Sequence, residues 1–335
     1  MNGPNLPWPL IRLAVLCSEE AYNAAVMSSA QQCNTLERTF VSQQTVDFHG
    51  KVVIVALSGT KGVRDWMVNL KHGPCDPKDV LGQQNSCHGG FLKASRSLID
   101  PLATYLDEYK DRSTLLFTGH SAGAATASIL YAHVLSEVTS QLVTVANTFT
   151  NIHCILFGCP PISTQPLQHH RRESNRSSSS IFLSFLNDGD PIIKADVRYI
   201  ASRLKWPKAT HPHLYSPRRD TNGKEMALLA SLVEKRSYRS FLHSGSLFIL
   251  TSGIDSAPLT SIKNVDNDEL DRMTDVSWRV HSVKVYKERI ESCEASLNHS
   301  GTAVGDQYNA DDCKENTSKR MHMENLRSSL LMMIV

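Results

Sequence analysis

One serine of the chain stands where a nucleophile could be presented. Ser121 lies in the segment Gly119-His120-Ser121-Ala122-Gly123, which fits the pattern G-x-S-x-G. An apolar run ends just before this segment and a stretch rich in alanine follows it, so the pattern joins a predicted strand to a predicted helix. A turn this sharp forces its serine into a strained conformation with the hydroxyl projecting. The segment predicts either close packing of strand and helix or a serine nucleophile, and its context favours the nucleophile.

A serine nucleophile needs a general base, and the base needs a carboxylate that orients it. Asp188 and Asp190 follow the buried run "FLSFLN", and loops at the ends of parallel strands carry the active-site residues of α/β folds. From the residues alone, both stay candidates. Among the histidines, His281 comes late in the chain and directly before a predicted helix. The others stand in loops or before a strand: His169, His170, His211, His213 and His243.

The elements that must position these residues alternate between strands and helices. Apolar positions at helical spacing predict helices over residues 11–27, 61–71, 89–110, 122–136, 226–234 and 282–290. Buried runs predict a hairpin over residues 46–57 and further strands over 114–118, 153–161, 181–187 and 246–250. This alternation is typical of an α/β fold with a mostly parallel central sheet.

The chain reads as one catalytic-sized domain followed by a tail. We expect the domain to span residues 8–290, with a polar, basic and serine-rich loop over residues 165–180 and a less regular insertion over 197–260. Residues 291–335 are polar and aperiodic, so we expect a mostly disordered tail. No internal repeat is visible.

Composition excludes some classes of function. The 335 residues carry a formal charge of +2, with 41% hydrophobic and 20% charged residues, which is typical of a soluble globular protein. The chain has no Lys/Arg stripe with interleaved aromatic residues, so we expect no nucleic-acid partner. The eight cysteines form no CxxC pair, and we expect neither a disulfide framework nor a metal site.

The N-terminal segment bears on localisation. Its apolar stretch lacks a basic beginning and a small-residue cleavage site, and Arg12 and two prolines interrupt it, which argues against a signal peptide. No segment approaches the length of apolar residues that a membrane helix needs. We therefore expect a cytoplasmic protein, or a secreted one if the N-terminus is truncated.

Six segments, taken in order, resemble the signatures of the class 3 lipases, the fungal triacylglycerol lipase family within the α/β-hydrolases. The first three are "VVIVALSGTKGVRDWMVNL" for a strand, Gly-Thr turn and lid helix, "CHGGFLKA" for a His-x-Gly-Phe segment, and "TGHSAG" for the elbow. The other three are "LFGCPPI" for a strand end, "NDGDPI" for an Asn-x-x-Asp turn, and "HSVKVY" for a terminal His with a following Tyr. The resemblance implies an α/β-hydrolase fold with helices on both faces of the sheet and a short lid helix.

The resemblance also implies a catalytic role for three residues. Ser121 would be the nucleophile and His281 the general base. Asp190 would orient His281, and it takes this role over Asp188 because it stands three residues after Asn187.

For the surroundings of the nucleophile, the resemblance implies an oxyanion hole and a lid. The backbone N–H groups of Thr60 and Ala122 would form the oxyanion hole. Residues 61–71 would form a lid whose apolar side chains cover the site in water and face lipid when open: Val63, Trp66 and Met67. The chain departs from the family at Ser58, where an Arg commonly stands, which changes a structural contact near the hole but leaves the chemistry possible.

These roles predict a serine hydrolase that cleaves carboxylic esters of lipids, a triacylglycerol or acylglycerol lipase, through a Ser-Asp-His triad and an acyl-enzyme. It would act at a lipid–water interface and require no metal or cofactor. A phospholipase A1, a diacylglycerol lipase or a soluble-ester esterase on the same fold is an alternative. A catalytically silent lipase-like scaffold is a further alternative, but it predicts a damaged triad, and all three candidates are present.

Overall fold

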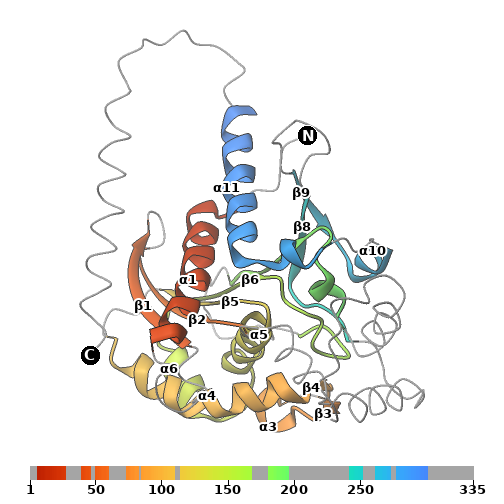
Figure 1. Cartoon of the computed structure of the whole chain (residues 1–335). Coiled ribbons are helices and arrows are strands. Elements are labelled where there is room, and N and C mark those ends of the chain that lie inside the picture. Colours follow the sequence, from red (N-terminus) through yellow and green to blue (C-terminus); the bar gives the residue numbers. More distant parts are fainter. Residues whose placement is uncertain are drawn as a thin grey trace. The chain divides into compact units, whose positions relative to one another are not determined.

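The described part of the chain is built around one central sheet. The computed structural model describes residues 6–27, 39–46, 50–59, 73–82, 84–109, 114–167, 180–195, 241–251, 261–272 and 277–300. Within them a seven-stranded sheet has the order β1-β2-β5-β6-β7-β8-β9 (Figure 1). Its strands are β1 (Thr39–Val46), β2 (Gly50–Leu57), β5 (Thr114–His120), β6 (Asn151–Phe157), β7 (Phe182–Asn187), β8 (Ser246–Thr251) and β9 (Ser261–Val265).

The strand directions make this sheet mostly parallel. Every neighbouring pair from β2 to β8 is parallel, and only the edge strands β1 and β9 pair antiparallel with their neighbours. The carboxyl ends of the central strands therefore meet along one edge, where α/β folds place their active-site loops. The α/β fold with a mostly parallel central sheet expected from the sequence is confirmed.

Alternate residues of the strands divide the core into two layers. Val53, Val55 and Leu57 of β2 pack into the cluster that holds helices α4 (Gly89–Asp107), α5 (Ala122–Val134) and α6 (Gln141–Ala146). The intervening Val52 and Ile54 pack into the cluster with α1 (Trp8–Met27) and α11 (Val283–Ser300). Because successive strand side chains point to opposite faces, a continuous apolar strand is buried on both sides. Helices thus cover both faces of the sheet, as predicted.

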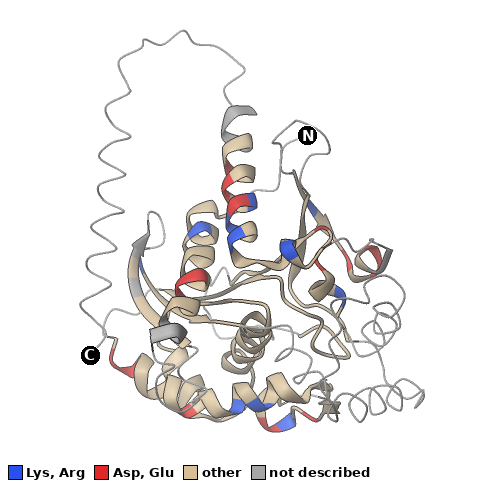
Figure 2. Cartoon of the chain, viewed as in Figure 1, with Lys and Arg blue, Asp and Glu red and all other residues tan. Residues whose placement is uncertain are grey.

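Helix α5 carries no charged side chain, and it is drawn in the colour of uncharged residues in Figure 2. All its residues are buried, and small ones dominate its first two turns. It contacts β2, β5 and β6 on one side and α4 on the other. A helix that is buried all round belongs inside a protein, and Ser121, the residue that begins this one, is itself buried.

Short elements stand between the larger ones along the chain. They are β3 (Pro74–Cys75), α3 (Lys78–Leu81), β4 (Cys87–His88), η2 (Pro191–Lys194), α10 (Asn267–Arg272) and η4 (Trp278–His281). The 3-10 helices η2 and η4 contact each other, although they come from distant parts of the chain.

The structure differs from the sequence-based expectations at several elements. Strand β1 occupies Thr39–Val46, earlier than the predicted start of the hairpin. Strand β9 and helix α6 were not predicted, since β9 is a mostly exposed edge strand without an apolar run and α6 has only six residues. Helix α11 continues to Ser300, past the domain boundary expected at residue 290.

The extension of α11 has a tertiary cause. Cys293 is buried against the α1 layer, and Glu294 pairs with Arg12 of α1 at 3.0 Å. The polar composition of this stretch suggested a disordered tail, but these contacts support the last turns of the helix. The predicted helices over 61–71 and 226–234 and the tail from residue 301 lie outside the described residues. In the part of the chain that is described, none of the helices has the length and apolar character to cross a membrane.

Candidate active site

Ser121 occupies a sharp turn between β5 and α5. Its φ of 59° and ψ of −127° make it the one non-glycine residue with positive φ among those described. Such a conformation costs on the order of 1–3 kcal/mol and persists only where the surroundings enforce it. The Ser121 N–H donates to the carbonyl of Phe157 at 3.0 Å, which ties the turn to the end of the neighbouring strand β6.

Two glycines permit this turn by allowing close approach to β2. A Cβ atom added at Gly123 would lie 2.1 Å from the carbonyl oxygen of Leu57, and one at Gly119 would lie 2.7 Å from the same atom. Real Cβ atoms do not approach backbone this closely. The first turn of α5 therefore packs directly on the end of β2, and this contact needs the two glycines of the G-x-S-x-G pattern.

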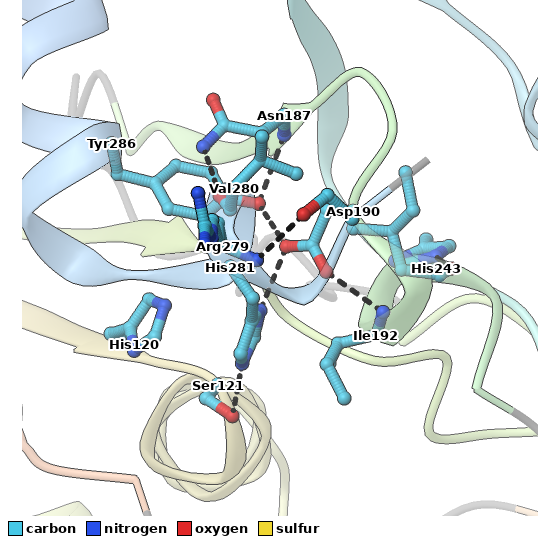
Figure 3. Close-up of polar contacts among 12 residues, drawn as sticks. His120, Ser121, Asn187, Asp190, Ile192, His243, Arg279, Val280, His281 and Tyr286 are labelled. Atoms are coloured by element: carbon cyan, nitrogen blue, oxygen red, sulfur yellow. Dashed lines mark hydrogen bonds and ion pairs between the residues drawn. The ribbon is translucent and has the colours of Figure 1, made fainter. Parts of the chain in front are cut away.

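His281 is hydrogen-bonded to both Ser121 and Asp190 (Figure 3). Its Nε2 lies 2.8 Å from Ser121 Oγ, and its Nδ1 lies 2.8 Å from Asp190 Oδ2. A carboxylate oxygen only accepts, so Nδ1 carries the proton and Nε2 is left to accept the hydroxyl proton of Ser121. The structure thus brings together the three residues for which the resemblance implied a catalytic role.

Asp190 is held by donors on both of its oxygens. The side chain begins η2, where Oδ1 accepts the Ile192 N–H at 2.8 Å, and Oδ2 accepts the hydroxyl of Tyr286 at 2.7 Å as well as His281. Asp190 is 1% exposed. Three fixed donors leave the carboxylate one orientation, toward His281. By contrast, the other candidate, Asp188, is exposed in the same turn.

Tyr286 of α11 connects the end of β7 to this carboxylate. Its hydroxyl accepts the Asn187 N–H at 2.9 Å and donates to Asp190. Burial, with a contribution from the charge of Asp190, raises the pKa of Tyr286 well above its usual value, so the phenol keeps its proton. No role for Tyr286 was predicted, and its place five residues after His281, as the Tyr of "HSVKVY", was the one sequence signal for it.

The segment that carries His281 is anchored to the Asp190 turn. Asn187 Nδ2 donates to the carbonyl of Val280 at 2.7 Å, and the Ser277 N–H donates to the carbonyl of Gly189 at 3.2 Å. The Ser277 side chain caps η4 by accepting the Arg279 N–H. These bonds fix the position of His281 although 91 positions separate it from Asp190.

His120, next to the serine, packs against His281. The centroids of the two rings are 4.6 Å apart. The hydroxyl oxygen of Tyr22, on α1, is hydrogen-bonded to His120 Nδ1 at 2.7 Å. Burial, followed by the charge of His281, lowers the pKa of His120 well below its usual value. Sequence reasoning gave neither residue a role, and the separation of 98 positions between them left no local signal.

The other described candidate base, His243, does not contact Ser121. Its Nε2 donates to the carbonyl of Ile193 at 2.6 Å, and it is buried behind η2. Burial lowers the pKa of His243 to about 4, despite the raising effects of this hydrogen bond and of Asp190. This hydrogen bond ties His243 to η2, so its role in the described structure is structural.

Part of the predicted surroundings of the nucleophile is described. Ala122 is the first residue of α5, and its N–H has no place in the helical hydrogen-bond ladder. The positive end of the helix dipole adds to the attraction that this N–H group exerts on an anion. Thr60 and the predicted lid residues Val63, Trp66 and Met67 lie outside the described residues. No group of three or more His, Cys, Asp or Glu side chains that could hold a metal ion occurs within the described ranges.

Comparison with known families gives a match over the centre of the chain. Residues 54–198 match the family model described as Lipase (class 3). The matched range contains Ser121 and Asp190, whereas His281 and the helices α1 and α11 lie outside it.

Curated relatives are similar over shorter stretches. The chain is 26% identical over 132 residues to phospholipase A1-II 2 of Oryza sativa subsp. indica, which is 32% of this chain and 33% of the relative. It is 24% identical over 151 residues to protein EDS1 of Arabidopsis thaliana, which is 44% of this chain and 23% of the relative. The chain therefore spans a third or less of the length of these relatives.

Solved structures align over most of the chain. The mono- and diacylglycerol lipase of Aspergillus oryzae aligns with 87% of this chain and 100% of its own, at 17% identity and a TM-score of 0.47. The Rhizomucor miehei lipase propeptide complex aligns with 76% of this chain and 71% of its own, at 15% identity and a TM-score of 0.43.

Proposed function

We propose, from the premise that residues 54–198 belong to the class 3 lipase family, that this protein is a serine hydrolase that cleaves carboxylic esters of lipids. The observation that carries the proposal is the chain of 2.8 Å contacts from Ser121 Oγ through His281 to Asp190, begun by a serine in a strained turn. A structural serine has no need of positive φ, a hydrogen-bonded imidazole and a buried carboxylate together.

The proposed reaction has two halves. His281 Nε2 takes the proton of Ser121 as Oγ attacks the ester carbonyl, and the resulting imidazolium donates that proton to the leaving alcohol. A water molecule then gives a proton to the same Nε2 and attacks the acyl-enzyme, and the proton returns to Ser121 as the acid leaves. Asp190 holds the Nδ1 proton throughout, so the ring stays in the tautomer that can accept from Ser121.

The oxyanion of each tetrahedral intermediate would be stabilised by backbone N–H groups. Ser121 N–H is already bonded to Phe157, so the next group along, the N–H of Ala122, is the one available at the start of α5. The second donor in this proposal is the N–H of Thr60. Loss of one such donor reduces turnover by roughly a hundred- to a thousandfold.

Labelling and turnover test the proposal together. A fluorophosphonate probe should label the full-length protein at Ser121, and Ser121→Ala should remove the label and lower turnover of a short-chain nitrophenyl ester by roughly 10⁶-fold. Ser128→Ala is a matched control, because Ser128 lies on the helix that Ser121 begins and its hydroxyl donates to the carbonyl of Ala125 within that helix. Labelling or turnover that persists in Ser121→Ala would exclude Ser121 as the nucleophile. A wild-type protein that neither reacts nor turns over would support the silent scaffold.

An acylglycerol is the substrate class that we propose first, and a phospholipid is the second. The similarity to a phospholipase A1 of rice is the specific observation that favours the second. Rates on triacylglycerol, diacylglycerol and phosphatidylcholine, each compared at equal interfacial area, distinguish the two, with Ser121→Ala as the blank. Release of fatty acid from phosphatidylcholine alone would replace the first proposal by the second.

The lid over residues 61–71 also remains a proposal. If it covers the site in water, the rate on a soluble ester should rise sharply when the ester concentration passes its solubility limit. Trp66→Ala should reduce that rise and leave the rate on the dissolved ester within about twofold, because the lid does no chemistry. A rate that follows simple saturation through the solubility limit would favour a soluble-ester esterase.

A further inference from the structure

Two imidazole rings lie together beside the elbow, and one of them has no place in the proposed reaction. His281 reaches Ser121 Oγ with its Nε2, while the ring of His120 packs against the ring of His281 at 4.6 Å with a tilt of 37°. Figure 3 shows the His120 ring beside the His281 ring, next to Ser121 at the start of α5. His120 is 4% exposed, so its ring is a wall of the site.

The ring of His120 is held on its other sides as well. Tyr22 Oη is hydrogen-bonded to its Nδ1 at 2.7 Å, and the ring of Tyr286 meets it edge-on at 5.5 Å. Contacts from α1, α11 and His281 thus leave the ring one orientation. Two of these contacts come from helices outside the range that matches the class 3 lipase model.

The hydroxyl of Tyr22 is itself fixed against the end of β2. A Cβ atom added at Gly59 would lie 2.5 Å from Tyr22 Oη and 2.9 Å from the Cβ atom of Ser121. The hydroxyl therefore packs between the end of β2 and the His120 ring, close to the elbow. Helix α1 supports the site through this residue.

The charge state of His120 matters to its neighbour. In the proposed reaction His281 becomes an imidazolium when it takes the Ser121 proton. A neutral ring beside it offers its π face to that charge, whereas a second imidazolium at 4.6 Å would repel it. Burial opposes protonation of His120, so the favourable state is the one that the fold maintains.

We propose that Tyr22 and His120 are positioning residues for His281: the Tyr22 hydroxyl orients the His120 ring, and this buried ring holds the general base against Ser121. The proposal rests on the proposed function. It assigns a role to helix α1 in the site and explains why a histidine precedes the nucleophile.

Three variants of the full-length chain test the proposal by kinetics on a soluble nitrophenyl ester. His120→Ala removes the wall, and we expect kcat to fall roughly ten- to a hundredfold with KM within about threefold of wild type. His120→Phe restores a neutral ring and should recover kcat to within about threefold. Tyr22→Phe frees the edge of the His120 ring and should lower kcat about threefold or more. Tyr131→Phe is the matched control, since Tyr131 is buried on α5 and its hydroxyl has no hydrogen-bond partner in the described structure.

The pH profile separates positioning from a merely structural role. In His120→Ala, water that enters the space solvates the imidazolium form of His281, so the acid limb of the kcat/KM profile should move to higher pH. His120→Phe should leave that limb in place. If His120→Ala keeps the wild-type kcat and pH profile, the proposal is wrong. It is also wrong if His120→Phe is as slow as His120→Ala and both are equally destabilised.

NMR spectra make the result independent of turnover. In a Ser121→Ala background, the His281 ring resonances should broaden when His120→Ala is added, because the ring is no longer held in one orientation, and not when Tyr131→Phe is added. If the wild type hydrolyses no ester but this broadening appears, the proposed function fails and the positioning contact stands. If ester is hydrolysed and the broadening is absent, the positioning proposal fails and the function stands.

Discussion

The two halves of the candidate site are held in place by different physical means. Ser121 is fixed by close packing, because β2 and the start of α5 approach so closely that only glycine fits on either side of the turn. Asp190 and His281 are fixed by hydrogen bonds among side chains and backbone from β7, η2, η4 and α11. The first half is local in the chain, and the second is assembled from segments far apart.

This difference determines which changes each half tolerates. A packed turn is sensitive to volume, so one added methyl group should destroy it while polar substitutions nearby do little. A hydrogen-bonded carboxylate and imidazole are sensitive to donors and charge, so exchange of one atom at constant shape should disable them without loss of fold. Substitutions that change one property at a time therefore distinguish the two halves.

Among the changes that compare the two halves, the largest effect is expected from Asp190→Asn. The amide keeps the shape of the carboxylate and can still accept from the Ile192 N–H, but its NH₂ group would donate to His281 Nδ1 and move the ring proton to Nε2. That tautomer cannot accept from Ser121, and we expect kcat to fall by roughly 10³- to 10⁴-fold. Steady-state kinetics and a melting curve check this, with the exposed Asp188→Asn as the matched control. Equal losses in the two variants would contradict the assignment of Asp190.

In the packed half, which holds Ser121, the matching substitution is Gly123→Ala, which adds volume and no charge. The added methyl group would lie 2.1 Å from the carbonyl oxygen of Leu57, so β2 and α5 must separate. We expect the free energy of unfolding to fall by about 3 kcal/mol or more, with much of the protein recovered insoluble. Urea denaturation measures this loss, and Ser128→Ala on the same helix should lose no more than about 1 kcal/mol. A fully stable Gly123→Ala would show that packing does not fix the elbow.

The same difference explains what the sequence could predict. The elbow was predictable because Gly119, Ser121 and Gly123 lie within five residues, between an apolar run and a stretch of small residues. Strand β2 was predictable for a similar reason, since burial on both faces makes it a continuous apolar run. Both the elbow and strand β2 depend on residues that are neighbours in the sequence.

The half of the site that holds Asp190 and His281, the acid–base half, was harder to predict from the sequence because its contacts join residues far apart in the chain. From the residues alone Asp188 and Asp190 were equivalent, and only the resemblance to class 3 lipases favoured Asp190. The contact of Tyr22 with His120 and that of Tyr286 with Asp190 each join residues more than 90 positions apart. Helix α11 continues past residue 290 because Cys293 and Glu294 contact α1. The polar residues around them in the sequence gave no sign of these contacts.

A pH-dependent loss of stability should arise beside the acid–base half, at His243. Its pKa is about 4 in the folded protein against an ordinary value of 6.5, so between these values the unfolded chain binds a proton that the folded chain does not. This contribution to stability is complete above pH 6.5 and is lost as the pH falls toward 4, by about 3 kcal/mol in all. Urea denaturation at pH 7 and at pH 4 measures it.

The control for this prediction is His243→Gln. A glutamine amide can still donate to the carbonyl of Ile193, but it does not titrate. The variant should therefore lose less stability than wild type over the same pH range. The other buried histidines with a lowered pKa, His120 and His133, contribute equally to both proteins and cancel. The same pH dependence in wild type and His243→Gln would rule out His243 as the source.

The smallest effect that still distinguishes the packed half from the hydrogen-bonded half is expected from Tyr286→Phe. Loss of the hydroxyl leaves the buried Asn187 N–H without its acceptor and removes one of three donors to Asp190, at a cost of about 1–3 kcal/mol in the free energy of unfolding. Because His281 and Ile192 still hold the carboxylate, kcat should fall by only about tenfold or less. Tyr131→Phe removes an equally buried hydroxyl that has no hydrogen-bond partner in the described structure, and it should be neutral or slightly stabilising. If both variants change stability equally, burial of the ring rather than the hydrogen bonds of Tyr286 holds this half of the site, and the distinction between a packed half and a hydrogen-bonded half fails.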